Sequence, residues 1–219
     1  MKPYYQDNYV TIYNCRCEDI LGELPKVDLV LTDPPYGMNL NTDFTCYKNK
    51  FKGKISGNKY DKITNDDKEI DLHEIINKGN DAVIFGADYF PTQLKNGTIN
   101  VWDKRNETLD AQFGSCFELI WHKNKCKKKF YRYKWAGIFG MEHEPTKTRV
   151  HPTQKPERLI KIILEEYEAA KTILDPFAGS CTTGRAAKDL NRKCICIELE
   201  EKYCGIGAKR MCQEVMNFN

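Results

Sequence analysis

Thr172-Ile-Leu-Asp-Pro-Phe-Ala-Gly-Ser-Cys-Thr-Thr-Gly184 is the stretch of the sequence that decides the fold. Its apolar start predicts a strand, its small residues predict a tight turn, and Arg185–Leu190 after it has the pattern of a helix. Gly179 lets the backbone approach a ligand closely, and the N–H groups that open the helix offer donors to a carboxylate or hydroxyl. The stretch therefore predicts a ligand-binding turn of an α/β fold.

A second strand with an acidic end follows this turn. Cys194-Ile-Cys-Ile-Glu198 is apolar up to its last residue. A carboxylate in that position typically accepts hydrogen bonds from the hydroxyl groups of a ribose. The Gly-x-Gly-x-x-Gly spacing of dinucleotide-binding proteins is absent, which disfavours a nicotinamide cofactor. The two segments together predict a site for a nucleoside cofactor.

The run Asp33-Pro34-Pro35-Tyr36 ends another predicted strand, Val27–Asp33. Open α/β sheets bind their ligands at the carboxyl ends of the strands. Prolines have a fixed φ and no N–H group, so their carbonyls can face a ligand instead of a neighbouring strand. A carboxylate, rigid acceptors and a flat ring suit an amino group on a planar heterocycle. The alternative is a proline-stiffened turn that merely ends a core strand.

The order of three motifs carries a family resemblance. Asp33-Pro34-Pro35-Tyr36 resembles the catalytic tetrapeptide of the amino-methylating DNA methyltransferases, which modify adenine N6 or cytosine N4. His151-Pro-Thr-Gln-Lys-Pro156 resembles the segment that precedes the cofactor strand in the β group of these enzymes. The catalytic motif comes first and the cofactor motif at 175–184 comes last, as in that group. The resemblance spans most of the chain from Val10 to Cys204, with a loosely matched middle.

The resemblance implies a role for each residue of the tetrapeptide. Asp33 would accept a hydrogen bond from the target amino group, the Pro34 carbonyl would accept a second, Pro35 would stiffen the turn, and Tyr36 would stack on the extruded base. These bonds would localise a lone pair that is otherwise delocalised into the ring, and would align it with the methyl group. Asp33 is thus expected to orient the amine and stabilise charge, and no covalent enzyme intermediate is expected.

The resemblance also implies S-adenosylmethionine as the cofactor. The residues expected to bind its methionine part are Asp175, Pro176, Phe177, Ala178, Gly179 and Ser180. Glu198 would hold the ribose, and Thr153 and Lys155 would contact the cofactor's carboxylate.

Two positions depart from the family pattern. Many relatives have Gly where this chain has Cys181, so either the turn is stiffer or the sulfur lines the pocket. Arg16 stands where an Asp normally meets the cofactor's adenine. Recognition of that adenine would then fall to the Cys17 backbone or to Asp19.

Length and composition predict one catalytic domain over residues 1–219. A chain of 219 residues with 41% hydrophobic content can bury one sizeable core. The expected fold class is α/β, a Rossmann-like doubly wound mixed sheet of the S-adenosylmethionine-dependent methyltransferases with short recognition insertions. No signal peptide or bilayer-spanning run is recognisable, which predicts a cytoplasmic protein without a membrane partner.

The cysteines and histidines predict no metal site. Ten cysteines without an export signal indicate reduced thiols. The pairs Cys15/Cys17 and Cys194/Cys196 have the wrong spacing for zinc and are interpreted as small buried residues on strands. The four histidines form no ligand spacing.

DNA is the expected partner, in duplex form, although the net charge of +3 is modest. The basic stretch His122–Trp135 carries aromatic residues and no acid, which suits phosphate contacts and stacking, with a solvated basic hairpin as the alternative. A mobile loop at about 38–66, including the lysine-rich 48–62, is expected to close over the flipped nucleotide. Sequence recognition is expected at about 104–150, including Arg105, Asn106 and Lys123–Lys134. A homodimer is left open.

The preferred function is methylation of adenine N6 in DNA, because Asp at the first motif position is commoner among adenine enzymes of the family. Methylation of cytosine N4 is the alternative within the family. A catalytically silent nucleic-acid-binding module is motivated by Arg16 and Cys181. An RNA or protein-glutamine methyltransferase shares similar tetrapeptides, but the segment His151–Pro156 favours the DNA enzymes.

Overall fold

The computed structural model describes residues 1–43, 62, 64, 66–68, 70–105, 115–135, 150–151 and 153–213. Most of the predicted loop at 38–66 and much of the predicted recognition region, including Asn106, lie outside these residues. The strands are β1 Tyr5–Gln6, β2 Val10–Asn14, β3 Val27–Thr32, β4 Gly79–Phe85, β5 Thr98–Asp103, β6 Phe117–His122, β7 Phe130–Arg132, β8 Thr172–Asp175 and β9 Lys193–Glu198. The helices are α1 Cys17–Ile20, α2 His73–Lys78, the short η2 Ala87–Tyr89, α3 Glu157–Glu165, α4 Thr182–Asp189 and α5 Glu201–Met211.

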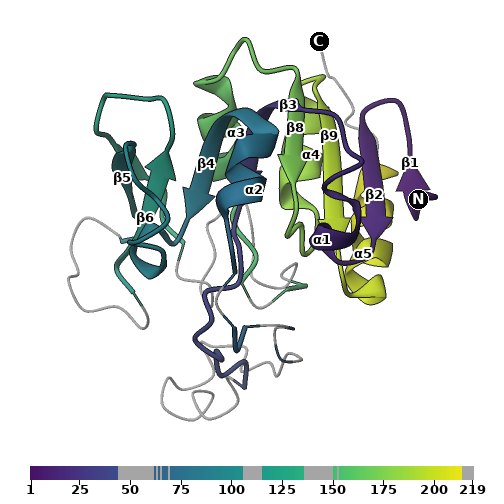
Figure 1. The fold of residues 1–219 in the computed structure, drawn as a ribbon, viewed down its shortest axis with the longest axis horizontal. Helices are drawn as coiled ribbons and strands as arrows, with labels where there is room; N and C mark the ends of the chain where they lie inside the picture. Colours follow the sequence, from purple (N-terminus) through teal and green to yellow (C-terminus); the bar gives the residue numbers. More distant parts are fainter. Residues whose placement is uncertain are drawn as a thin grey trace.

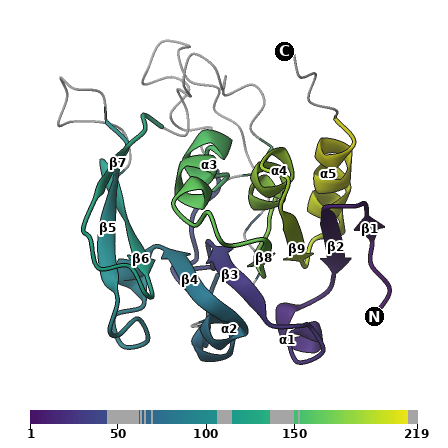
Figure 2. The ribbon, with the colours of Figure 1, turned by 90° about the horizontal axis from the view of Figure 1, so that it is seen from above.

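The described strands form one mixed sheet, in the order β1-β2-β9-β8-β3-β4-β6-β5-β7. The strands from β2 to β4 in this order are parallel, and β6 runs antiparallel to both β4 and β5. Figure 2 shows α1 and α2 on one face of the sheet and α3, α4 and α5 on the other. This arrangement confirms the predicted doubly wound α/β fold.

Adjacent strands β3 and β8 come from opposite halves of the chain (Figure 1). The chain leaves β3 towards β4 on one side, and leaves β8 towards β9 on the other. Such a change of direction opens a crevice beyond the carboxyl ends of the two strands. The fold thereby brings the segment after β3 next to the turn after β8, as the motif order predicted.

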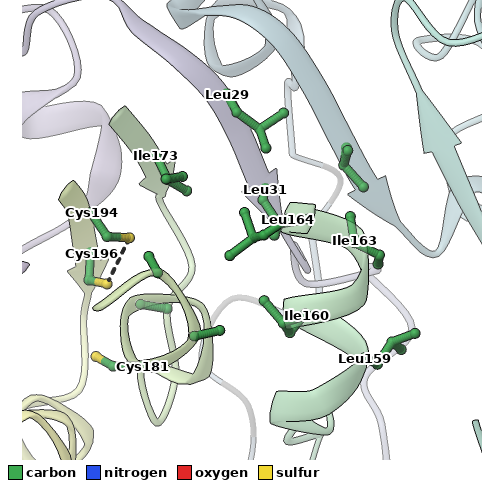
Figure 3. Close-up of a cluster of buried hydrophobic side chains, with 14 of the residues drawn as sticks. Leu29, Leu31, Leu159, Ile160, Ile163, Leu164, Ile173, Cys181, Cys194 and Cys196 are labelled. Carbon is green, nitrogen blue, oxygen red and sulfur yellow. Dashed lines mark hydrogen bonds between the residues drawn. The ribbon is translucent and has the colours of Figure 1, made fainter. Parts of the chain in front are cut away.

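Strand β3 lies at the centre of the core because both of its faces are apolar. Leu29 and Leu31 are fully buried on one face, and Val30 is fully buried on the other. A continuous apolar run is typical of a parallel strand covered by helices on both sides. Figure 3 shows α3 packed over Leu29 and Leu31 through an apolar stripe made of Leu159, Ile160, Ile163 and Leu164.

The two cysteine pairs have different environments. Cys194 and Cys196 lie on β9, are almost fully buried and face the same core (Figure 3), as predicted. The strand prediction for Cys15 and Cys17 is wrong, because β2 ends at Asn14 and Cys17 begins α1. Within the described ranges, no helix is long and apolar enough to span a membrane.

Candidate active site

A cavity of about 560 Å³ lies at the carboxyl ends of the parallel strands. Segments that follow β3, β4, β8 and β9 line it. The lining residues include every candidate site residue except Asp19, the alternative to the Cys17 backbone for adenine recognition. They are Asp33, Pro34, Pro35, Tyr36, Cys17, Thr153, Lys155, Asp175, Pro176, Phe177, Ala178, Gly179, Ser180 and Glu198. The volume falls in the range of small-molecule sites, about 300–1,000 Å³.

Asp33 directly follows β3 and is held by two donors. The Tyr36 hydroxyl lies 2.5 Å from Oδ1, and the Lys155 ammonium lies 2.5 Å from Oδ2. Burial raises the pKa of Asp33, and the neighbouring Lys155 charge opposes that rise. A carboxylate has about four lone-pair positions, so each oxygen can accept a further hydrogen bond. Asp33 is therefore a fixed acceptor at the wall of the cavity.

Glu118 on β6 is a second buried carboxylate of this wall, and no sequence motif marks it. Oε1 accepts a hydrogen bond from Lys155 at 3.0 Å and lies 3.1 Å from the Tyr36 hydroxyl, and Oε2 lies 2.7 Å from Lys104 Nζ. Burial alone would raise the pKa of Glu118, but the two ammonium groups lower it to about 2. Glu118 is thus ionised throughout the neutral range.

The Tyr36 ring lies in an aromatic stack at the edge of the cavity. It stacks on Tyr89 with ring centres 4.4 Å apart and planes within 8°. Tyr89 belongs to η2, which begins after Gly86 in the left-handed conformation at φ 67°. The turn after β4 thus places Tyr89 beside Tyr36 at the cavity wall.

Gly86→Ala is expected to displace the Tyr36 ring. A Cβ at position 86 would lie 2.2 Å from Tyr36 Cε1, and the positive φ disfavours a side chain as well. We expect the free energy of unfolding to fall by about 1–3 kcal/mol, measured by urea denaturation. Gly22→Ala is the control, because no atom of the described residues lies within 4 Å of its added Cβ. Equal denaturation midpoints for the two variants would contradict this account of Gly86.

Asp66 organises the backbone after the tetrapeptide. Its Oδ1 accepts hydrogen bonds from the N–H groups of Tyr36 and Gly37, both at 3.0 Å, and Oδ2 accepts one from Leu40 at 2.8 Å. Asp66 is 5% exposed. A buried carboxylate with three backbone donors fixes a turn, so Asp66 sets the direction in which Tyr36 enters the cavity. No sequence motif pointed to it.

The predicted cofactor turn follows β8. Asp175 is 4% exposed, and its Oδ1 accepts hydrogen bonds from Thr32 Oγ1 at 2.7 Å and Phe177 N at 3.2 Å. Burial raises the pKa of Asp175 to about 6. Gly179 has a positive φ of 50°, and a Cβ there would approach the His151 ring. The turn thus brings backbone to the cavity wall without a side chain in between.

Glu198 at the end of β9 faces the same turn. Its Oε2 accepts a hydrogen bond from Gly179 N and its Oε1 accepts one from Glu200 N, both at 2.7 Å. Burial raises the pKa of Glu198 to about 7 in spite of these two bonds. Two backbone donors orient the carboxylate and leave one lone pair on each oxygen for a ligand. This geometry fits a pair of neighbouring hydroxyl groups.

The segment before α3 contributes His151, Thr153 and Lys155. His151 packs edge-on against Tyr203 at 4.4 Å, and its Nδ1 lies 3.2 Å from Thr153 Oγ1. Lys155, expected at the cofactor's carboxylate, instead bonds to Asp33 and Glu118.

The two departures from the family pattern have structural explanations. Cys181 caps α4 with a positive φ of 56°, a conformation that favours glycine. Its sulfur is fully buried and would lie 2.5 Å from a Cβ at Gly207, so it packs into the core and does not line the cavity. Arg16 lines the cavity and lies 3.7 Å from Glu18, whereas Asp19 is not among the lining residues.

Several residues of the basic stretch His122–Trp135 make contacts within the protein. Lys123 donates to the Gly79 carbonyl at the start of β4, and Lys125 donates to Glu166 after α3. These contacts place the lysines at the edge opposite the cavity. Two of the aromatic residues expected to stack on nucleic acid, Tyr131 and Trp135, are buried in the core instead.

The fold and the site define a class of protein: a Rossmann-like α/β domain with a carboxylate–proline motif after β3 and a glycine-containing turn after the neighbouring strand β8. The family model for DNA methylases that act on N6 or N4 matches residues 64–209. The chain belongs to this family.

Three known proteins illustrate the relationship. The DNA adenine methyltransferase YhdJ of Escherichia coli is 27% identical over 88% of this chain and 80% of its own. The crystal structure of the M1.HpyAVI–SAM complex is similar with a TM-score of 0.54 at 23% identity, covering 93% of this chain and 100% of that one. The cytosine-N4-specific PvuII DNA methyltransferase has a TM-score of 0.64 at 15% identity, covering 99% and 91%. The two structures support the fold.

Proposed function

We propose that this DNA methyltransferase transfers a methyl group from S-adenosylmethionine to the N6 atom of adenine. The observation that carries the proposal is the single cavity that joins Asp33 after β3 to Gly179 and Glu198 on the cofactor side. The meeting of these segments supports one catalytic domain over the chain. When bound, the cofactor supplies an electrophilic methyl group on a sulfonium.

The residues on the cofactor side fit such a group. Glu198 presents two oriented oxygens that suit the ribose hydroxyls, and the turn around Gly179 offers close backbone contact for the methionine part. Phe177 and the Cys17 segment add apolar surface and backbone groups at the cavity wall. The ribose hydroxyls, the carboxylate and the adenine ring of S-adenosylmethionine match these partners. This match supports S-adenosylmethionine over a dinucleotide as the cofactor.

The residues on the catalytic side suit an exocyclic amine. Asp33 would accept one N–H of the target and the Pro34 carbonyl the other, which localises the nitrogen lone pair. As the nitrogen gains positive charge, the Asp33 carboxylate would stabilise it and then accept the released proton, for which burial has raised its pKa. Tyr36 would stack on a base taken out of the duplex.

Adenine is preferred to cytosine on the tetrapeptide itself, which begins with Asp, and on the name of the Escherichia coli relative. Methylation of cytosine N4 is the second candidate, since the PvuII enzyme of that specificity has the same fold. Both bases present an amino group beside a ring nitrogen, so the same acceptors serve either one. The identity of the methylated base is therefore the quantity to measure.

The test is incubation with tritium-labelled S-adenosylmethionine and unmethylated duplex DNA, followed by digestion to nucleosides and identification of the labelled species. Parallel reactions contain single-stranded DNA, RNA and protein as acceptors, with Asp33→Ala as the inactive control. Label in N6-methyladenine that disappears in the control is expected. Label in N4-methylcytosine would change the base assignment. Label confined to RNA or protein, or none despite cofactor binding, would refute the proposal.

A further inference from the structure

Lys155 lies between two buried carboxylates, one of which is the proposed catalytic acceptor. Its Nζ is 2.5 Å from Asp33 Oδ2 and 3.0 Å from Glu118 Oε1, and its side chain is 11% exposed. The rings of Phe85 and Tyr36 flank the ammonium at 5.2 and 5.9 Å. A buried ammonium is stabilised only by such partners, so Lys155 is fixed in place by the two acids.

The charges alternate in sign along a chain of contacts: Asp33, Lys155, Glu118 and then Lys104. Glu118 is anchored independently of Asp33, because Lys104 holds its Oε2 at 2.7 Å. Its other oxygen is thereby aimed at Lys155. This alternation of charges matters for catalysis. Without the charge of Glu118, the Lys155 ammonium beside Asp33 would oppose positive charge on a nearby nitrogen.

We propose that Lys155 and Glu118 form a positioning pair for Asp33: Lys155 orients the carboxylate and keeps it charged, and Glu118 cancels the ammonium charge that would otherwise oppose the cation forming on the target nitrogen. This inference rests on the proposed methyl transfer. It also assigns Lys155 to the catalytic half of the site and not to the cofactor's carboxylate.

The ionisation of Asp33 is the property through which the pair acts. Burial raises the pKa of Asp33, Lys155 lowers it, and Glu118 adds to the rise. The titratable groups that interact with Asp33 are Lys155, Glu118, Tyr36 and Asp175. Two further titratable groups lie beside these: Lys104 bonds to Glu118, and Tyr89 stacks on Tyr36. Removing Lys155 should therefore raise the pKa of Asp33, whereas removing the charge of Glu118 should lower it.

The experiment compares Lys155→Met and Glu118→Gln with the unmodified protein. Single-turnover methylation is measured from about pH 5.5 to about pH 9, together with cofactor affinity. In parallel, the Asp33 carboxyl group is titrated in the substrate-free protein by carbon-13 NMR with labelled aspartate, assigned through Asp33→Asn. Lys161→Met is the matched control, because Lys161 also bridges two carboxylates, Glu157 and Asp189, but does not line the cavity.

For Lys155→Met we expect the acid limb of the rate profile to move up by at least about one pH unit, with a rate loss of about tenfold on that limb that diminishes as the pH rises. Cofactor affinity should not change. For Glu118→Gln the acid limb should move down while the plateau rate falls. The profile of Lys161→Met should match that of the unmodified protein.

A different set of results would overturn the inference. Weaker cofactor binding by Lys155→Met with an unmoved acid limb would assign Lys155 to the cofactor's carboxylate. An Asp33 titration that Lys155→Met leaves unchanged would also refute it, whether or not the protein methylates DNA. If the titration shifts but no acceptor is methylated, the proposed function fails and the ion-pair account of Asp33 stands. If Lys155→Met does not fold, the test is decided by the direction in which Glu118→Gln shifts the acid limb and the pKa of Asp33.

Discussion

Asp33→Asn is expected to lower the rate of methyl transfer by about 10²–10³-fold, the loss seen when a preorganised electrostatic contact to a transition state is removed. Asn is nearly isosteric with Asp, but it has one acceptor oxygen and one NH₂ donor. Lys155 Nζ lies 2.5 Å from Asp33 Oδ2, and because it is a donor the Asn oxygen would have to take that position. The NH₂ group would then face the target amine, where an acceptor is needed and a positive charge develops.

The prediction is specific to the catalytic step. The hydrogen bonds of Asp33 go to Tyr36 and Lys155 and not to the turn after β8. The affinity for S-adenosylhomocysteine, measured by calorimetry, should therefore change by less than about twofold. Asp67→Asn is the matched control, because Asp67 is exposed and does not line the cavity. A rate within about tenfold of the unmodified protein would remove Asp33 from the proposed mechanism.

The parts of the site that could be predicted from sequence are those in which neighbours in the chain are also neighbours in space. Asp33 and Tyr36 belong to one turn, and Asp175 and Gly179 belong to another. Each turn follows an apolar strand, so its place at the carboxyl edge of the sheet follows from the order of strands. The fold could be predicted in the same way, since Leu29–Leu31 of β3 and Ile173–Leu174 of β8 are apolar.

Contacts between distant segments could not be predicted in this way. Glu118 reaches Asp33 only because β6 pairs antiparallel with β4, and nothing in the sequence around Glu118 marks that neighbour. Asp66 caps the turn of Tyr36 across a long segment, again without a motif. The position of Lys155 in the cavity was predicted, but its partner was not, because a lysine within reach of several acceptors has no preference that is visible in sequence.

The basic stretch illustrates the same limit for charge. The sequence shows a run of lysines with aromatic residues. It does not show at which end of the strands, or on which face of the sheet, each side chain lies. Lys123 and Lys125 lie at the edge away from the cavity, and Tyr131 is 5% exposed. Phe130 in contrast is 62% exposed and lies beside Arg132. Composition thus indicated a polyanion partner without locating the contact surface.

Glu198→Gln is expected to weaken cofactor binding about 10–100-fold at about pH 8, because hydrogen bonds from hydroxyls to a charged group contribute about 1.5–3 kcal/mol. Gln keeps one acceptor oxygen but replaces the other by a donor. The Gly179 and Glu200 N–H groups each occupy one side of the carboxylate, at 2.7 Å. The NH₂ group of Gln would meet one of these donors, so the substituted side chain would rotate away from the ribose.

Cofactor affinity should also depend on pH through the same residue. Burial raises the pKa of Glu198 to about 7, so its carboxyl group is mostly neutral below that pH and ionised above it. Because the ionised form accepts both hydroxyls, binding of S-adenosylhomocysteine should tighten by about tenfold between about pH 6 and about pH 8 and then level off. Asp175, with a pKa of about 6, adds a smaller dependence at the lower end of this pH range.

In Glu198→Gln the rise in affinity near pH 7 should be absent, whereas the exposed Glu201→Gln should retain it. Calorimetry of the three proteins across this range tests the assignment, and an unchanged pH dependence in Glu198→Gln would move the ribose contact to another residue.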